Sequence, residues 1–275
     1  MGVVNVTPDS FYDGGLYFEP ARAIEHALKL VADGADIIDV GGESSRPGAG
    51  PVSAREERKR VLPVIEVVRE KKNVLISVDT AKADVAEAAL AEGAHLVNDI
   101  SAGRFDPDLL PLVSRTGAGL ILMHMKGTPR TMQGLARYED VLAEVKAFLA
   151  GRLAAAGEAG VRPAAMICDP GIGFAKTLEH NLALINGLPE LAGLGRPLLV
   201  GLSRKSFIGQ ILGAEPGDRL EGTIAAAVVS ALNGASILRV HDVLEVRRAL
   251  AVAEAIVGRG PGRLAPEALG KPYVH

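Results

Sequence analysis

The chain has 275 residues, of which 48% are hydrophobic and 23% are charged, and its formal net charge is −3. This balance is typical of a globular protein, and the lack of a basic excess argues against binding to nucleic acid or to anionic membranes. There is one cysteine, no secretory signal peptide, and no apolar run of membrane-spanning length, which is about 18 residues or more, so we expect a cytoplasmic protein without disulfides or membrane spans.

Short apolar segments alternate with amphipathic helical segments from one end of the chain to the other. Strands are expected near residues 2–5, 36–40, 74–78, 95–98, 119–123, 165–168, 198–201 and 236–240. Helices are expected between them, among others over 20–33, 54–70, 81–91, 138–157 and 221–233. Eight strand–helix units predict an α/β fold, a single (β/α)8 TIM barrel over residues 1–257, with a doubly wound open sheet as the alternative. The Gly- and Pro-rich residues 258–275 are expected to form a tail without chemistry.

A weak internal repeat indicates which end of the barrel carries the site. In each copy a helical segment ends on a glycine that leads directly into a strand, and the four glycines are Gly34, Gly93, Gly117 and Gly234. The connections before these strands are therefore short, whereas those after strands are longer, as at 7–19, 41–53, 126–137 and 171–176. Because active sites of such barrels lie on the loops that follow the strands, we expect the site at that rim.

Polar side chains close all eight predicted strands. In chain order they include Asn5, Asp39, Asp79, Asn98, His124, Asp169, Lys205, Arg239 and His241. Any single one could simply cap the following helix. Their recurrence at every strand end instead predicts a shared site.

The strand-end residues fall into two chemical groups. Asp79, Asn98 and Asp169 provide hydrogen-bond acceptors and one amide, which suits a flat heterocycle with several N–H donors. The basic group suits a phosphate or diphosphate and consists of Arg46, Lys205, Arg239 and His241. The two groups could also merely pair with each other across the rim. If they do not, they predict a substrate that is rich in donors at one end and anionic at the other.

Metal and covalent chemistry are constrained by the same residues. The histidine spacing and the single cysteine argue against zinc, whereas Mg2+ could be held by the Asn5 amide oxygen together with substrate phosphates. Asn5 could equally be a structural amide at the strand end. No Ser-His-Asp or Cys-His arrangement stands out, so no covalent intermediate is predicted.

Eight short motifs, in this order along the chain, resemble those of the dihydropteroate synthase family. They lie at residues 4–11, 42–48, 77–80, 98–100, 123–125, 169–174, 203–207 and 239–242. The resemblance implies a pterin-binding barrel of folate biosynthesis. Such an enzyme condenses 6-hydroxymethyl-7,8-dihydropterin diphosphate with p-aminobenzoate and releases diphosphate. It also implies Mg2+ dependence, a homodimer and membership of the enzyme class that sulfonamides target.

The resemblance assigns roles to individual residues. The pterin would be held by Asp79, Asn98, Asp169 and Lys205. The diphosphate would be held by Arg239 and His241, with Asn5 on Mg2+. The p-aminobenzoate site would be formed by Ser45, Arg46, Phe174 and Ser206. Lys205, Arg46 and Asp79 would be the catalytic residues, and Asp39 would support the strand-end network. The chain departs from the family at Ala175, where glycine is common, and at Ser45, where threonine is common.

Two other functions and one ambiguity remain open at this point. A methyltetrahydrofolate-dependent methyltransferase would share the acidic and amide residues but would not need the basic group. A non-catalytic pterin-binding paralogue would be expected to lack Lys205, Arg46 or His241, all of which are present. The apolar segment 223–232 predicts either a helix packed between barrel neighbours or a subunit interface.

Overall fold

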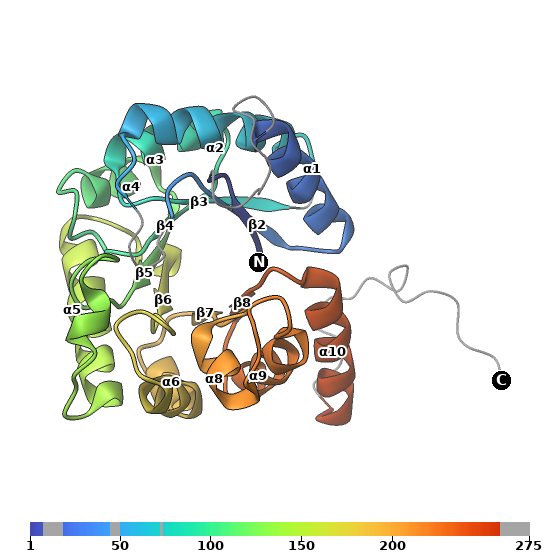
Figure 1. Cartoon of the computed structure of the whole chain (residues 1–275). Coiled ribbons are helices and arrows are strands. Elements are labelled where there is room, and N and C mark those ends of the chain that lie inside the picture. The colour runs from blue at the N-terminus through green and yellow to red at the C-terminus, as the bar shows by residue number, and fades with distance from the viewer. Residues whose placement is uncertain (8–18, 45–49, 72–73, 259–275) are drawn as a thin grey trace.

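The computed structural model describes residues 1–7, 19–44, 50–71 and 74–258, which form a ring of parallel strands inside a layer of helices (Figure 1). The strands are β1 (Gly2–Asn5), β2 (Ile37–Gly41), β3 (Leu75–Asp79), β4 (Leu96–Asp99), β5 (Gly119–Met123), β6 (Met166–Asp169), β7 (Leu199–Gly201) and β8 (Ile237–Arg239). Each predicted strand is found within one residue of its expected bounds.

The ring is completed by two short seams. Strands β1 to β6 form one continuous parallel sheet, and β7 and β8 form a second. Isolated parallel bridges connect Cys168 with Leu198 at one seam and Gly2 with Val240 at the other. At the second seam the Val240 amide also donates to the Met1 carbonyl at 2.9 Å. The single barrel is therefore confirmed, and the open doubly wound sheet is wrong.

The helices lie outside the strands. The α-helices are α1 (Glu19–Ala32), α2 (Ala54–Val68), α3 (Ala83–Glu92), α4 (Leu109–Thr116), α5 (Val141–Glu158), α6 (Leu178–Asn186), α7 (Leu188–Ala192), α8 (Ser206–Leu212), α9 (Leu220–Leu232) and α10 (Val243–Ile256), and the short 3-10 helices are η2 (Met132–Leu135) and η3 (Pro163–Ala165). The five helices predicted with bounds are α1, α2, α3, α5 and α9. Helix α2 begins as expected, because the Ser53 hydroxyl accepts a hydrogen bond from the Glu56 amide at 3.3 Å.

Glycines end the helices that the repeat predicted. Gly34, Gly93, Gly117 and Gly234 have φ values of +92°, +117°, +71° and +103°. Residues with a Cβ rarely adopt this left-handed conformation, so these glycines allow a tight turn from helix to strand. The four copies of the repeat therefore mark four helix-to-strand turns at the same end of the barrel.

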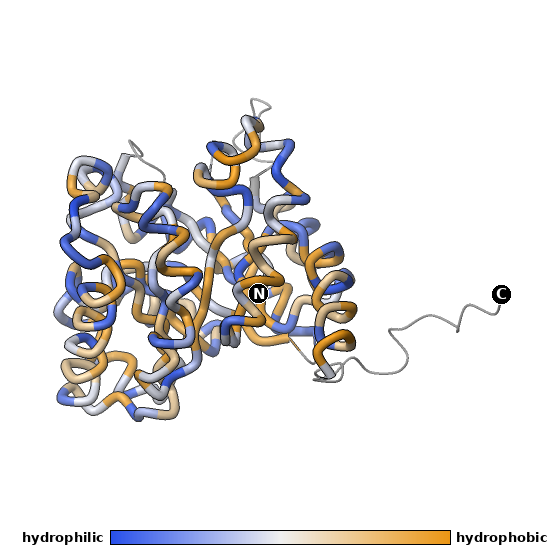
Figure 2. Tube along the Cα trace, turned by 90° about the horizontal axis from the view of Figure 1, so that it is seen from below, coloured by the Kyte–Doolittle hydropathy of each residue, from blue (hydrophilic) through white to orange (hydrophobic). Residues whose placement is uncertain are grey.

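The core lies on both faces of the strands. All five residues of β2 are buried, as are Val78, Val97 and Leu120 on the neighbouring strands. Parallel strands covered by helices on one side and by the opposite strands on the other are expected to be apolar throughout. In Figure 2 the outer helices alternate hydrophilic and hydrophobic stretches, in keeping with one buried face each. None of the helices in the described part of the chain has the length and hydropathy to cross a membrane.

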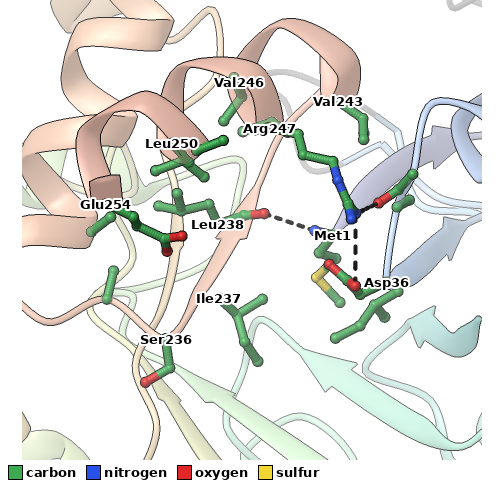
Figure 3. Close-up of a pocket in the computed structure, with 17 residues that line it drawn as sticks. Met1, Asp36, Ser236, Ile237, Leu238, Val243, Val246, Arg247, Leu250 and Glu254 are labelled. Carbon is green, nitrogen blue, oxygen red and sulfur yellow. Dashed lines mark hydrogen bonds and ion pairs between the residues drawn. The ribbon is translucent and has the colours of Figure 1, made fainter. Parts of the chain in front are cut away.

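The two ends of the barrel differ in character. A cavity of about 380 Å3 opens where the strands begin, beside α10, and is shown in Figure 3. There the amino group of Met1 donates to the Leu238 carbonyl at 2.9 Å, and Arg247 points toward Asp36, with 3.9 Å between the charged atoms. The predicted site residues lie at the other end, where the strands finish.

Candidate active site

The parallel register places the polar strand ends side by side. Asn5 is paired with Gly41, Gly41 with Asp79, and Asp79 with Asn98. Asp39 lies two residues before Gly41 on β2 and therefore occupies the next layer down on the same face. A Cβ at position 41 would lie 3.3 Å from the Asp79 Cβ, so glycine keeps space open above Asp39.

Arg239, the last residue of β8, joins the acidic residues from across the barrel. Its Nε donates to Asp39 Oδ2 at 2.6 Å, and its Nη2 donates to Asp79 Oδ2 at 2.8 Å. The Asn98 Nδ2 donates to the same Asp39 Oδ2 at 3.0 Å. Asp39, Asp79, Asn98 and Arg239 are thus one network, which we call the strand-end network.

The strand-end network contains two carboxylates but one guanidinium, and one of its carboxylate oxygens has no donor among the described residues. Burial raises the pKa of Asp79 to about 7, with Arg239 lowering it and Asp39 raising it. Burial also opposes the Arg239 charge, but Asp39 and Asp79 outweigh this and raise the pKa of the guanidinium. The fully buried Asp39 keeps one oxygen, Oδ1, without a donor among the described residues. A buried acceptor without a partner is costly, so Asp39 Oδ1 lowers the stability of the network.

Asp169 and Lys205 form a second group at the ends of β6 and β7. Asp169 is buried, and its Oδ1 accepts the Gly171 amide at 2.7 Å. Burial raises the pKa of Asp169 although Lys205 lowers it, and burial lowers the pKa of Lys205 to about 8 although Asp169 raises it. The Lys205 Nζ donates to the Ile172 carbonyl and lies 4.7 Å from the ring centroid of Phe174. An acid, an amine and an aromatic ring therefore meet at one point of the rim.

His241 is held beside this group by Ser203. The Ser203 Oγ accepts the His241 amide at 3.2 Å and lies 3.0 Å from the His241 Nδ1. Burial and the nearby Arg239 lower the pKa of His241 to about 4. His241 is therefore a neutral hydrogen-bonding group at pH 7 in the free protein, and not one of the cations that the sequence predicted.

Most of the predicted site residues are brought to one rim. The strand-end network, Asp169, Lys205, Phe174 and His241 share it, and Asn5 ends the neighbouring β1. Ser206 is the exposed first residue of α8, directly after Lys205. Ser45 and Arg46 lie outside the described residues. The alternative of pairing across the rim is seen at Arg239, so the acidic and basic groups are not separate.

Two ion and hydrogen-bond clusters beside the site contain lysines that were not singled out from the sequence, although His124 in the second cluster was. On one side Lys82 contacts Glu43 and lies 2.5 Å from an oxygen of Glu57, a buried residue of α2. These three residues line a cavity of about 300 Å3 that also reaches Asp79. On the other side, the buried Lys176 lies 3.1 Å from the His124 Nδ1. The only available signal was that each lysine closes a loop that follows a strand.

Residues 1–241 match the family described as pterin binding enzyme. Dihydropteroate synthase of Escherichia coli K12 is 47% identical over 255 residues, covering 93% of this chain and 90% of that protein. A structure of Xanthomonas albilineans dihydropteroate synthase with 4-aminobenzoic acid is 45% identical, with a TM-score of 0.88, and covers 93% and 92% of the two chains. Another from the same organism, in complex with 7,8-dihydropteroate, is 42% identical with a TM-score of 0.85 over 93% and 92%.

Proposed function

The chain belongs to the pterin binding enzyme family, and from this premise we propose how its residues carry out the reaction. The reaction is that of a dihydropteroate synthase in folate biosynthesis: 6-hydroxymethyl-7,8-dihydropterin diphosphate and p-aminobenzoate give 7,8-dihydropteroate and diphosphate. The observation that carries the residue roles is the strand-end network, which joins hydrogen-bond acceptors and a cation at one rim.

The pterin ring binds to the acidic side of the rim. Asp169 uses Oδ1 for the Gly171 amide and offers Oδ2 to the ring, where a carboxylate can accept from adjacent N–H groups. Asn98 uses one N–H for Asp39 and keeps its carbonyl oxygen and second N–H for the ring edge. Asp79 and Lys205 complete this binding site. The N–H groups of the ring donate to these carboxylates.

The diphosphate binds to the basic side. Among the described residues, Asp39 and Asp79 accept from Nε and Nη2 of Arg239, and the Nη1 group remains for a phosphate oxygen. The Ser203 Oγ accepts the His241 amide and can donate to Nδ1, which leaves the proton on Nε2 for a second phosphate oxygen. Arg239 thus contributes charge and His241 contributes a neutral donor.

Mg2+ fits this rim as an ion that arrives with the substrate. The described residues contain no cluster of three His, Cys, Asp or Glu side chains that could hold a metal by themselves. Mg2+ often binds through one or two protein oxygens, substrate phosphates and water, and Asn5 at the end of β1 offers an amide oxygen. When bound, the ion would neutralise charge on the departing diphosphate.

The p-aminobenzoate site lies on the Phe174 side of Lys205. Phe174 offers a ring face, Lys205 a cation and Ser206 a hydroxyl at the start of α8. Ser45 and Arg46 complete the site in the proposal, as the family resemblance implies. The aromatic amine is then placed next to the pterin methylene carbon.

The chemical step needs positioning and electrostatics more than proton transfer. The carbon–oxygen bond to diphosphate breaks, the amine nitrogen bonds to the same carbon, and the nitrogen then loses a proton. An aromatic amine is unprotonated at neutral pH, so no strong base has to activate it. Asp79 and Asp169 offset positive charge that develops on the dihydropterin, while Arg239 stabilises the leaving anion.

Diphosphate release tests the proposal directly. With pterin diphosphate, p-aminobenzoate and Mg2+, we expect release of one diphosphate for each dihydropteroate formed, and no sustained release when p-aminobenzoate is omitted. Removal of Mg2+ with a chelator should abolish turnover. Release that does not depend on p-aminobenzoate, or turnover that survives the chelator, would contradict the corresponding part of the proposal.

We further propose that the enzyme is a homodimer, formed through the outer face of the last three helices. This face carries exposed large apolar side chains, namely Ile211, Leu212, Val229, Leu232, Val252 and Ile256. Isolated exposed apolar residues are ordinary, but several on adjacent helices favour a protein interface. Light scattering should give twice the mass of one chain; a monomeric mass at micromolar concentration refutes this. The cytoplasmic location stays a prediction.

A further inference from the structure

Lys176 is a buried lysine to which the proposed reaction assigns no role. Lys176 is 6% exposed and belongs to the loop between β6 and α6. The Nζ donates to the Phe174 carbonyl at 2.8 Å and lies 3.1 Å from the His124 Nδ1. Lysine is rarely buried unless its amine has specific partners, so these two contacts call for an explanation.

The loop that contains Lys176 is fixed at several further points. The Gly173 amide donates to Asn181 Oδ1 at 2.7 Å, and the Tyr138 hydroxyl donates to the Ala175 carbonyl at 3.0 Å. Ala175 has a φ of +52°, a left-handed conformation that disfavours residues other than glycine. Phe174 therefore lies in a strained turn whose shape is imposed by its neighbours, and Lys176 holds the carbonyl of Phe174 itself.

His124 connects this lysine to the pterin side of the site. The His124 amide donates to the Asp169 carbonyl at 2.9 Å, and its own carbonyl would lie 2.0 Å from a Cβ on Gly171. Burial, followed by Lys176, lowers the pKa of His124 to about 3, so the ring is neutral and its Nδ1 can accept a hydrogen bond. Lys176 thus spans from the end of β5 to the backbone of the loop.

Charged residues of the site influence the pKa of Lys176. Burial lowers the pKa of Lys176 to about 7, Asp169 raises it, and Lys205 and Lys126 lower it. The Lys205 Nζ in turn lies 4.7 Å from the Phe174 ring centroid. Any movement of the Phe174 backbone would therefore change both the aromatic face and the position of the ring against Lys205.

We propose that Lys176 is a positioning residue that fixes the Phe174 backbone, and through it the face that receives p-aminobenzoate. This inference rests on the proposed function, because it assumes that Phe174 contacts p-aminobenzoate. It predicts that loss of the Lys176 side chain weakens the binding of p-aminobenzoate more than the binding of the pterin. The reason is that Asp169 keeps its own hydrogen bond to the Gly171 amide.

The test is a double-mutant cycle of Lys176→Met and Phe174→Ala, with Lys29→Met as the control. Lys29 is exposed on α1 and pairs only with Asp33 among the contacts described for it. We expect Lys176→Met to raise the KM for p-aminobenzoate by about tenfold or more, with pterin binding changed by less than about threefold. The double variant should be no worse than Phe174→Ala alone, because coupled residues are not additive.

A second measurement reports the local stability of the loop and does not depend on turnover. Hydrogen exchange of the 170–177 segment should be faster in Lys176→Met than in the wild type, and unchanged in Lys29→Met. An unaltered KM for p-aminobenzoate, equal effects on both substrates, additive effects in the cycle, or unaltered exchange would each overturn the inference. If the wild type itself made no dihydropteroate, the proposed function would fail instead, so the two failures are distinct.

A milder substitution keeps the proposal testable if the first variant does not fold. Should Lys176→Met fail to fold, Lys176→Gln replaces it in the cycle. Its side chain is one atom shorter and cannot reach both the Phe174 carbonyl and His124. We then expect the KM for p-aminobenzoate to rise about threefold. An unchanged KM in this folded variant also refutes the proposal.

Discussion

Replacing Asp169 by asparagine distinguishes the roles of the two oxygens of this carboxylate. The Oδ1 of Asp169 accepts the Gly171 amide at 2.7 Å, and an asparagine carbonyl oxygen can keep that bond. Its amide nitrogen would then take the place of Oδ2, the oxygen proposed to accept from the pterin. Asp169→Asn therefore preserves the loop and turns an acceptor into a donor that faces ring N–H groups.

The size of the effect follows from the burial of this residue. Asp169 is 5% exposed, so a bound pterin would have little water to compensate for the lost acceptor. Truncating one partner of a buried charged hydrogen-bond pair costs about 2–5 kcal/mol, which is a loss of roughly 30- to 4000-fold in affinity. Folding should not suffer, because burial already raises the pKa of this carboxyl and disfavours its charge.

Calorimetry with a non-reactive pterin analogue measures this loss. The control is Asp140→Asn, the same change at the exposed N-cap of α5, whose side chain accepts from the Leu142 and Ala143 amides. We expect the control to bind the analogue like the wild type. A folded Asp169→Asn variant with wild-type affinity would refute the assignment of Asp169 to the pterin.

Three further changes test other parts of the site. If the pterin binds the ionised form of Asp79, whose pKa burial raises to about 7, its affinity should fall about tenfold between pH 8 and pH 6, and a flat calorimetric profile would exclude this. Arg239→Met leaves the buried Asp39 and the partly buried Asp79 without their cation and should lower the free energy of unfolding by about 3–5 kcal/mol in urea melts; an unchanged midpoint would contradict the network. Gly171→Ala places a Cβ 2.0 Å from the His124 carbonyl oxygen and should prevent stable folding, whereas Gly134→Ala has open space and should melt like the wild type; equal melting of the two would contradict the packing.

The strands and their order were predictable because they depend on local pattern. Apolar segments that are buried on both faces have to be strands or buried helices, and their length and the helix-ending glycines decide between the two. The strand-end network was predictable for a related reason. Because β3 and β4 pair in parallel with their ends in register, Asp79 and Asn98 lie side by side.

The parts that were not predictable depend on contacts between distant loops. Nothing local distinguishes Lys176, which becomes buried only when the loop after β6 lies against the end of β5. Asp99 shows the opposite case. It is the neighbour of Asn98, but its carboxylate accepts from the Ser101 and Gly103 amides and so closes a turn, the capping role that any single strand-end residue could have had.

The protonation of the buried groups connects stability with binding. Asp79 has a folded pKa raised from 3.8 to about 7, so the folded state binds more protons than the unfolded state between those pH values, and stability falls as pH rises through this window. Lys176 has a folded pKa lowered from 10.5 to about 7, so the folded state binds fewer protons between 7 and 10.5, and stability rises with pH there. These two groups therefore contribute least to stability near neutral pH. A pterin that donates hydrogen bonds to these carboxylates stabilises their ionised form. Part of its binding free energy therefore comes from offsetting the desolvation cost of the ionised carboxylates, which is not offset in the free protein.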